Sequence, residues 1–142
     1  MDIATRIIEA RDCGVVIAGV RAYAVESVRE AAQQFELFAT EDIYHEIDAA
    51  EARRILLGVL RCDMAYGLQL MAPELARALA DEFVTALEED AAKFYTNGGF
   101  GRPDRSPGTL TQWNPATPAT FDTGVLAVAR EHVACVWVMD ED

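Results

Sequence analysis

Apolar residues recur at helical spacing through the middle of the chain. From Ile55 to Leu70 they follow one another at steps of three or four residues, and the same spacing continues from Leu75 to Phe94. Such spacing lines one face of a helix with apolar side chains. The pattern therefore predicts two successive helices, over about residues 49–71 and 73–96.

Capping and helix-breaking residues indicate how these two helices begin and connect. Asp48 can cap the first helix, and Glu51 three residues later completes the pattern of a capping box. Pro73 ends the first helix and suits the first turn of the second, where its missing N–H costs nothing. Because the connection is short, we expect an antiparallel helical hairpin. The run Asn97-Gly98-Gly99 is the predicted end of the second helix.

The C-terminal part of the chain changes to an apolar, β-branched pattern. Residues 124–139 form two such runs around the polar interruption Arg130-Glu131-His132, which is typical of a β-hairpin. Both runs are apolar at nearly every position, so we expect them to be covered on both faces or to stand centrally in a sheet. Residues 15–20 are the candidate third strand. A helix running straight through them to Phe38 is the alternative.

The remaining segments complete a prediction of one α+β domain over residues 1–142. An N-terminal helix is predicted over residues 2–12, with Arg11 on its water-facing side, and a further helix from Arg21 to about Ala39. We expect the N-terminal helix and the helical hairpin to pack on a small antiparallel sheet that contains the C-terminal β-hairpin. The length suffices for one hydrophobic core.

Residues 98–122 show neither helical nor alternating spacing and are rich in Gly and Pro. Irregular segments of this length are usually functional or disordered. Trp113 within this segment either plugs the side of the core or serves as an aromatic anchor for a partner.

The composition is strongly acidic, and this narrows the classes of partner. The 24 Asp and Glu residues outnumber 12 Lys and Arg, for a formal net charge of −12. Nucleic-acid binding requires clustered Lys and Arg, so we expect no nucleic-acid partner. No apolar run approaches the ~20 residues of a membrane-spanning helix, and the N-terminus lacks a signal-type segment. We therefore expect a cytoplasmic protein without a membrane partner.

Two acidic segments are the candidate binding surfaces. Six carboxylates and no Lys or Arg occur between residues 36 and 51, and the chain ends in three consecutive acidic residues. If residues 41–47 form a helical turn, Glu41 and His45 share one face. One imidazole and scattered cysteines make a poor metal site, so we predict no metal, no cofactor and no catalytic residue. The predicted partner-binding residues are Glu41, Asp42, Glu46, Asp48, Trp113, Asp140, Glu141 and Asp142.

These observations favour an interaction protein over an enzyme. The first hypothesis is a small acidic module, of the inhibitor, immunity-protein or adaptor type, that docks a basic protein partner. The alternative is a small enzyme or ligand-binding domain that uses the 98–122 loop and the 41–51 carboxylates around a pocket. A third hypothesis is an acidic homo-oligomer in which the long helices pair. Nucleophile-elbow, Walker and dinucleotide motifs are absent from the sequence.

Overall fold

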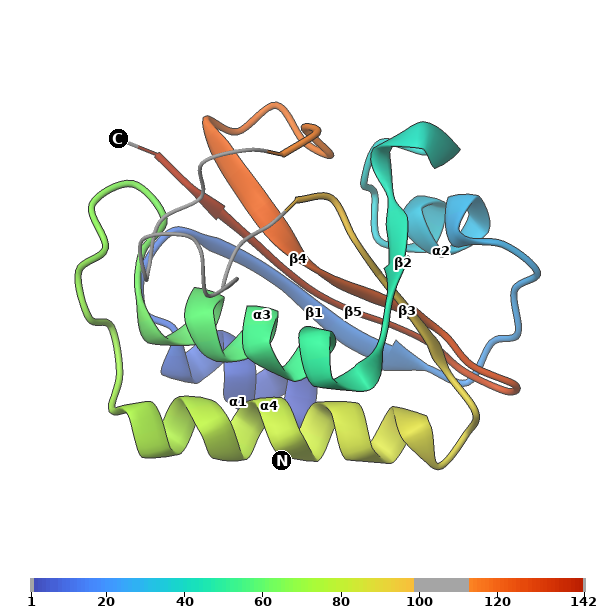
Figure 1. Cartoon of the computed structure of the whole chain (residues 1–142), viewed down its shortest axis with the longest axis horizontal. Coiled ribbons are helices and arrows are strands. Elements are labelled where there is room, and N and C mark those ends of the chain that lie inside the picture. Colours follow the sequence, from blue (N-terminus) through green and yellow to red (C-terminus); the bar gives the residue numbers. More distant parts are fainter. Residues whose placement is uncertain (1, 99–112, 142) are drawn as a thin grey trace.

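The computed structural model describes residues 2–98 and 113–141. As predicted, the protein has an α+β fold in which helices pack on an antiparallel sheet that contains the C-terminal hairpin (Figure 1). The elements in chain order are α1 (Ile3–Ala10), β1 (Val15–Arg21), α2 (Val28–Gln34), the 3₁₀ turn η1 (Glu41–Ile43), β2 (His45–Ile47), α3 (Ala49–Arg61), α4 (Pro73–Glu88), β3 (Lys93–Thr96), β4 (Phe121–Val128) and β5 (Val133–Asp140).

The five strands lie in the order β1-β5-β4-β3-β2, and every neighbouring pair is antiparallel. Residues 15–20 are therefore a strand and not part of a helix: Val15 lies opposite Met139, and Arg21 lies opposite Val133. This places the C-terminal hairpin centrally, as its double-sided apolar pattern predicted. Strands β1 and β2 form the two edges of the sheet.

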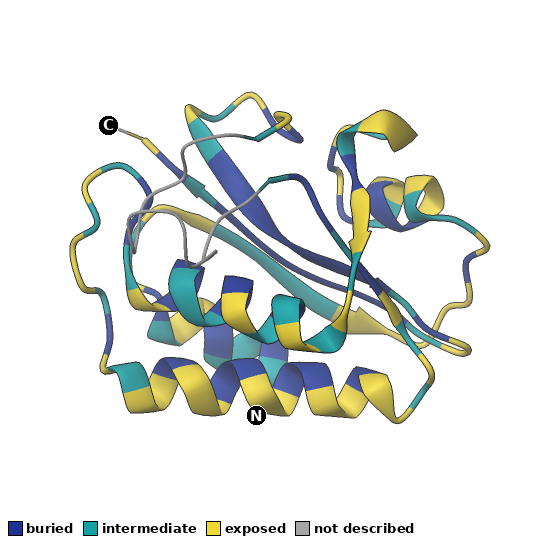
Figure 2. Cartoon of the chain, viewed as in Figure 1, coloured by how far each residue is buried: buried dark blue, intermediate teal, exposed yellow. Residues whose placement is uncertain are grey.

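The central strands are buried along almost their whole length (Figure 2). Val136 faces the core formed with α1, α3 and α4, whereas the neighbouring Trp137 faces the core formed with α2. This alternation follows from the two-residue period of a strand. Because one hairpin supplies side chains to both cores, its residues are apolar at nearly every position.

The helical pair α3 and α4 confirms the predicted hairpin and its N-terminal signals. The Asp48 carboxylate accepts a 2.7 Å hydrogen bond from the backbone N–H of Glu51, and Pro73 occupies the first turn of α4. Phe83 on α4 is fully buried in the core that α4 shares with α1, α3 and the central strands. Both helices, however, end earlier than the periodic pattern predicted.

Helix α3 ends at Arg61 and not near residue 71, because Asp63 captures backbone N–H groups that a helix would use. Its carboxylate oxygens accept hydrogen bonds from the N–H of Tyr66 and of Leu68, and Gly67 adopts a left-handed φ of 71°. Asp side chains often compete with helical hydrogen bonds in this way. Tyr66 continues the apolar spacing in the sequence but lies in an exposed turn.

Helix α4 ends at Glu88 and not near residue 96. Ala91 has a left-handed φ of 55°, and the N–H of Ala92 donates to the Leu87 carbonyl, which is the pattern of a helix C-terminal motif. Lys93–Thr96 then forms β3, whose aromatic and β-branched residues suit a strand. A non-glycine residue makes the left-handed turn here, so the sequence signal for it was weak.

The region between residues 21 and 47 also differs from the prediction. Only Val28–Gln34 is α-helical, because Ser27 caps its start and Glu36 adopts a positive φ of 61° after its end. Residues 41–47 form the turn η1 and the strand β2. Glu41 and His45 therefore do not share a helical face.

Candidate functional site

Four of the predicted binding residues form an exposed group at one edge of the sheet. We call Glu41, Asp42, Glu46 and Asp48 the acidic edge. They belong to η1, to the outer strand β2 and to the cap of α3, and all four are exposed. None of them takes part in the Arg and Lys ion pairs recorded among residues 2–98 and 113–141. Their charges are therefore directed mainly to solvent.

Neighbouring residues change the electrostatic environment at individual positions of the acidic edge. Arg29 lines a shallow hollow of about 430 Å³ with Glu41 and Asp42, so one cation offsets part of the negative potential there. On the other side, Glu46 lies opposite Tyr95 in the β2–β3 pair. Burial first, and then the Glu46 carboxylate, raise the pKa of Tyr95 above its ordinary value.

The predicted C-terminal acidic residues have different environments. Asp140 is buried and forms an ion pair with Arg11, at 2.8 Å between Nη2 and Oδ2. It is therefore not a surface charge, and the expectation that Arg11 faces water is wrong. Glu141 is exposed and accepts a hydrogen bond from the Thr120 N–H. Asp142 lies outside the described residues.

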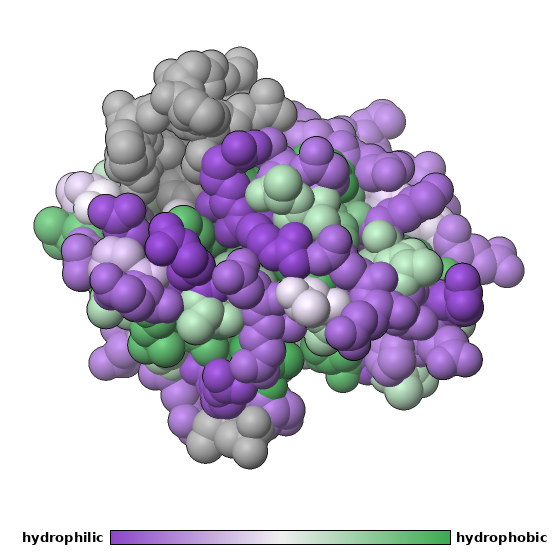
Figure 3. Space-filling model, turned by 60° about the horizontal axis from the view of Figure 1, so that its bottom comes forward, coloured by the Kyte–Doolittle hydropathy of each residue, from purple (hydrophilic) through white to green (hydrophobic). Residues whose placement is uncertain are grey.

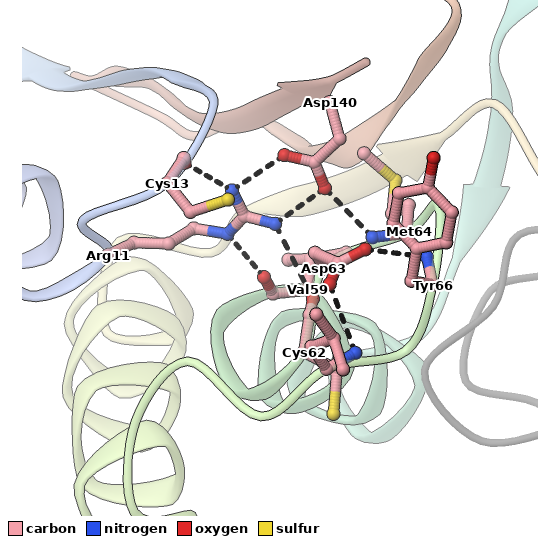
Figure 4. A network of polar contacts seen from close by, with 9 residues as sticks. Arg11, Cys13, Val59, Cys62, Asp63, Met64, Tyr66 and Asp140 are labelled. Carbon is pink, nitrogen blue, oxygen red and sulfur yellow. Dashed lines mark hydrogen bonds and ion pairs between the residues drawn. The ribbon is translucent and has the colours of Figure 1, made fainter. Parts of the chain in front are cut away.

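The Arg11–Asp140 pair joins segments from across the fold (Figure 4). The Arg11 guanidinium donates to the carbonyls of Val59 at 2.6 Å and Cys13 at 2.7 Å, while Asp140 also accepts from the Met64 N–H at 2.9 Å. These bonds satisfy the buried charges. They tie the end of α1 and the start of β1 to α3, to the following turn and to the end of β5.

Gly14 allows β1 to begin beside this buried pair. It has a left-handed φ of 67°, and a Cβ at this position would lie 2.3 Å from Oδ1 of Asp140 and 2.4 Å from the Met139 carbonyl oxygen. Only glycine tolerates both the left-handed φ and these close contacts. Nothing in the local sequence around Arg11 indicated this role, since its partner lies 129 residues away.

A second surface feature, missed at the sequence level, lies beside the buried pair. It is an open hollow of about 570 Å³ that we call the C-terminal hollow. Its walls come from the start of β1, the turn after α3, the segment before β4 and the end of β5. The lining residues are Cys13, Gly14, Val15, Asp63, Tyr66, Leu68, Pro118, Ala119, Met139, Asp140 and Glu141.

Trp113 has the contacts of a core residue and is not among the described lining residues of the C-terminal hollow. Its ring packs on Phe121, with 5.5 Å between ring centroids, and it contacts the core shared with α1, α3 and α4. It is half-buried. The structure thus favours the predicted core role of Trp113 over the role of an exposed anchor.

Asp122 holds the described segment after Trp113 on the sheet. Its buried carboxylate accepts hydrogen bonds from the Trp137 indole N–H at 3.0 Å, the Asn97 amide and the Ala116 N–H. The sequence placed Asp122 at the end of an irregular segment and gave no sign of this role. The network positions Pro118, which lines the C-terminal hollow.

The acidic edge and the C-terminal hollow lie far apart. Figure 1 shows η1 and β2 toward one end of the molecule's long axis and the C-terminus toward the other. The structure therefore does not bring the two predicted acidic segments together into one surface.

The long helices offer no large apolar surface that would indicate pairing. Figure 3 shows mostly hydrophilic side chains on the side turned forward, with small separate hydrophobic areas. Leu75 on α4 is the exposed large hydrophobic residue recorded on that helix. Homo-oligomerisation through these helices remains a prediction.

Comparisons with protein-family models, with curated proteins and with solved structures found no match for this chain. Within the described ranges, no helix has both the length and the apolar character needed to cross a bilayer. Nor does this part of the chain bring together three or more His, Cys, Asp or Glu residues suited to a metal ion. A function must therefore be inferred from the surfaces themselves.

Proposed function

We propose that this protein is a small acidic interaction module that docks a basic protein partner through the acidic edge, in the manner of an inhibitor, immunity protein or adaptor. The observation that carries the proposal is the exposure of Glu41, Asp42, Glu46 and Asp48, without an ion pair to a described Arg or Lys. Such a group of charges attracts a basic surface and orients it before contact.

Composition and thiol state agree with this proposal. The net charge of −12 favours encounter with cationic proteins and opposes self-association. The three cysteines are free thiols, as is usual in a reducing compartment, and the proposal places the protein in the cytoplasm.

The test compares two variants that change the net charge equally. The edge variant carries Glu41→Gln, Asp42→Asn and Glu46→Gln, and the control variant carries Glu9→Gln, Glu26→Gln and Glu74→Gln, three exposed carboxylates elsewhere. The partner is first captured with the wild-type protein from lysate of the source cells, and association is then measured at several salt concentrations.

We expect the edge variant to associate about tenfold more slowly at low salt and to show a flatter salt dependence. The control variant should associate at nearly the wild-type rate. Equal effects of the two variants would mean that net charge alone acts, and would refute docking through the acidic edge.

The alternative of a small enzyme or ligand-binding domain has less support. It requires the 41–51 carboxylates to line a pocket together with the 98–122 loop. Glu41 and Asp42 line only the shallow hollow of about 430 Å³, all four carboxylates of the acidic edge are exposed, and the larger C-terminal hollow lies toward the other end of the molecule. Residues 99–112 of that loop lie outside the described residues, so this alternative stays a prediction.

A further inference from the structure

The C-terminal hollow gathers the most exposed apolar side chains of the described chain. Tyr66 is 67% exposed, Leu68 63% and Val15 59%, and these are the three highest values among the large hydrophobic residues described. All three line this one hollow, together with Met139. Apolar side chains clustered around a concavity are typical of a binding surface.

The hollow is also negatively charged. Asp63, Asp140 and Glu141 line it, and no Lys or Arg is among its described lining residues. Arg11, behind the lining, neutralises Asp140. The recorded hydrogen bonds to the Asp63 carboxylate come from backbone N–H groups, so its charge is not balanced by a cation there. Apolar walls combined with carboxylates suit an occupant that has an apolar stem and a positive end.

We propose that the C-terminal hollow is a docking site for an arginine side chain, flanked by apolar residues, on a basic protein partner. An arginine stem packs on apolar walls while its planar guanidinium hydrogen-bonds carboxylates and stacks on aromatic rings. Glu141 and Tyr66 supply those two kinds of contact. The inference rests on the proposed function only in taking the partner to be a basic protein, because its residues are separate from the acidic edge.

The shape of the hollow favours a protein segment over a free small ligand. Small-molecule sites usually enclose most of the ligand surface, whereas the Tyr66, Leu68 and Val15 side chains are more than half exposed. A protein partner can cover such an open rim. A second copy of this chain would instead bring its own excess of carboxylates against those of the hollow.

The proposal can be tested by NMR titration of the full-length, isotopically labelled protein with short peptides. The probe is acetyl-Leu-Arg-Leu-amide. The matched control replaces arginine by citrulline, which has nearly the same shape but no charge. We expect saturable shifts of the Val15, Tyr66 and Leu68 amides and of the Met139 methyl group, with a dissociation constant about tenfold higher for the citrulline peptide.

Two variants locate the site on the protein. Leu68→Ser and Glu141→Gln should each raise the dissociation constant of the arginine peptide about fivefold. Both residues are exposed, so the fold should be retained. Leu75→Ser on α4, another exposed leucine outside the hollow, should bind as the wild type does.

Several outcomes would overturn the proposal. These are equal shifts with the arginine and citrulline peptides, shifts mainly outside the hollow, or unchanged binding by Leu68→Ser. A further titration uses acetyl-arginine-amide, which lacks the flanking leucines. If it binds as tightly as acetyl-Leu-Arg-Leu-amide, the hollow is a site for a free cationic ligand. If the shifts depend only on protein concentration, the hollow is occupied by a second copy of the chain.

The edge variant separates this inference from the proposed function. It leaves the C-terminal hollow intact and should bind the arginine peptide as the wild type does. If the edge variant docks the partner no differently from the control variant while the arginine peptide binds in the hollow, only the proposed function is refuted. If the edge variant loses salt-dependent docking as expected but the arginine peptide does not bind in the hollow, only the role of the hollow is refuted.

Discussion

At the scale of single residues, burial decides whether a charged side chain supports the fold or stays available at the surface. Arg11 and Asp140 are both buried and satisfy each other and nearby backbone groups. Removing water from two charges is costly, and the cost is offset only while both partners and their hydrogen bonds are present. Asp140 therefore acts as a structural group, whereas the neighbouring Glu141 keeps its charge at the surface.

Breaking this pair from one side should strongly destabilise the protein. We expect Asp140→Asn to lower the free energy of unfolding by about 3 to 5 kcal/mol, because it leaves the Arg11 charge buried and unbalanced. Urea unfolding measures the change. The double variant Arg11→Met/Asp140→Leu should cost less than the sum of its single changes. Additive costs would show that the two side chains do not interact.

At the scale of elements, each helix is stabilised through one apolar face and through its ends. Figure 2 shows buried residues on the side of α4 that faces the rest of the molecule. Its C-terminal end is joined to the β4–β5 turn by Asp90, whose carboxylate accepts from the Glu131 N–H and lies 2.9 Å from the His132 Nδ1. Helix α4 is thus stabilised by packing along its buried face and by the hydrogen bonds of Asp90 just after its C-terminal end.

Packing predicts a clear contrast between two apolar residues of α4. Phe83 is 0% exposed and Leu75 is 45% exposed. Phe83→Ala should cost about 3 to 5 kcal/mol because it leaves a cavity, whereas Leu75→Ala should change the unfolding free energy by less than about 1 kcal/mol. Thermal or urea unfolding measures both. A melting temperature unchanged by Phe83→Ala would show that Phe83 does not support the core.

The tether at the end of α4 should give a pH-dependent contribution to stability. The hydrogen bond with His132 first, and then that from the Glu131 N–H, lower the pKa of Asp90 below its ordinary value. A carboxyl whose pKa is lowered by folding stabilises the protein above its unfolded pKa of about 3.9 and loses this contribution as the pH falls through the folded value.

We therefore expect Asp90→Ala to be less stable than the wild type at pH 7, with a difference that shrinks as the pH falls below about 4. Urea unfolding over a pH series measures this difference. Glu89→Ala, at the exposed neighbouring position, is the control and should show no such trend. A difference independent of pH would mean that the Asp90 charge contributes nothing.

At the scale of the whole molecule, one sheet connects two hydrophobic cores. β4 and β5 supply alternate side chains to the core under α1, α3 and α4 and to the core under α2. Unfolding of the sheet would therefore expose the apolar side chains of both cores to water. The predicted single domain over residues 1–142 therefore implies one cooperative unfolding transition.

This cooperativity can be measured with two signals from different parts of the fold. Far-ultraviolet circular dichroism reports helices, and tryptophan fluorescence reports Trp137 in the α2-side core together with Trp113. We expect both to give the same midpoint, and Phe83→Ala to shift both equally although Phe83 belongs to the other core. Two separate midpoints would show independently unfolding halves and would contradict the single-domain prediction.

The sequence by itself determined the α+β class, the helical pair and the C-terminal hairpin, and it indicated the run of carboxylates that the structure places at the acidic edge. Each depends on local information: apolar spacing, a capping Asp48, a proline at the start of α4, and charges without neighbouring cations. Only the tertiary structure decided where α3 and α4 end, because Asp63 and Ala91 redirect the chain through hydrogen bonds and a left-handed φ that periodicity does not record.

The tertiary structure also decided which acidic residues reach solvent and which apolar ones gather into a site. Asp140 looks like a surface charge in the sequence, but its counter-ion Arg11 is 129 residues away. The C-terminal hollow combines residues from the beginning, middle and end of the chain. Such contacts depend on how distant segments meet in the folded core, so no local pattern could have indicated them.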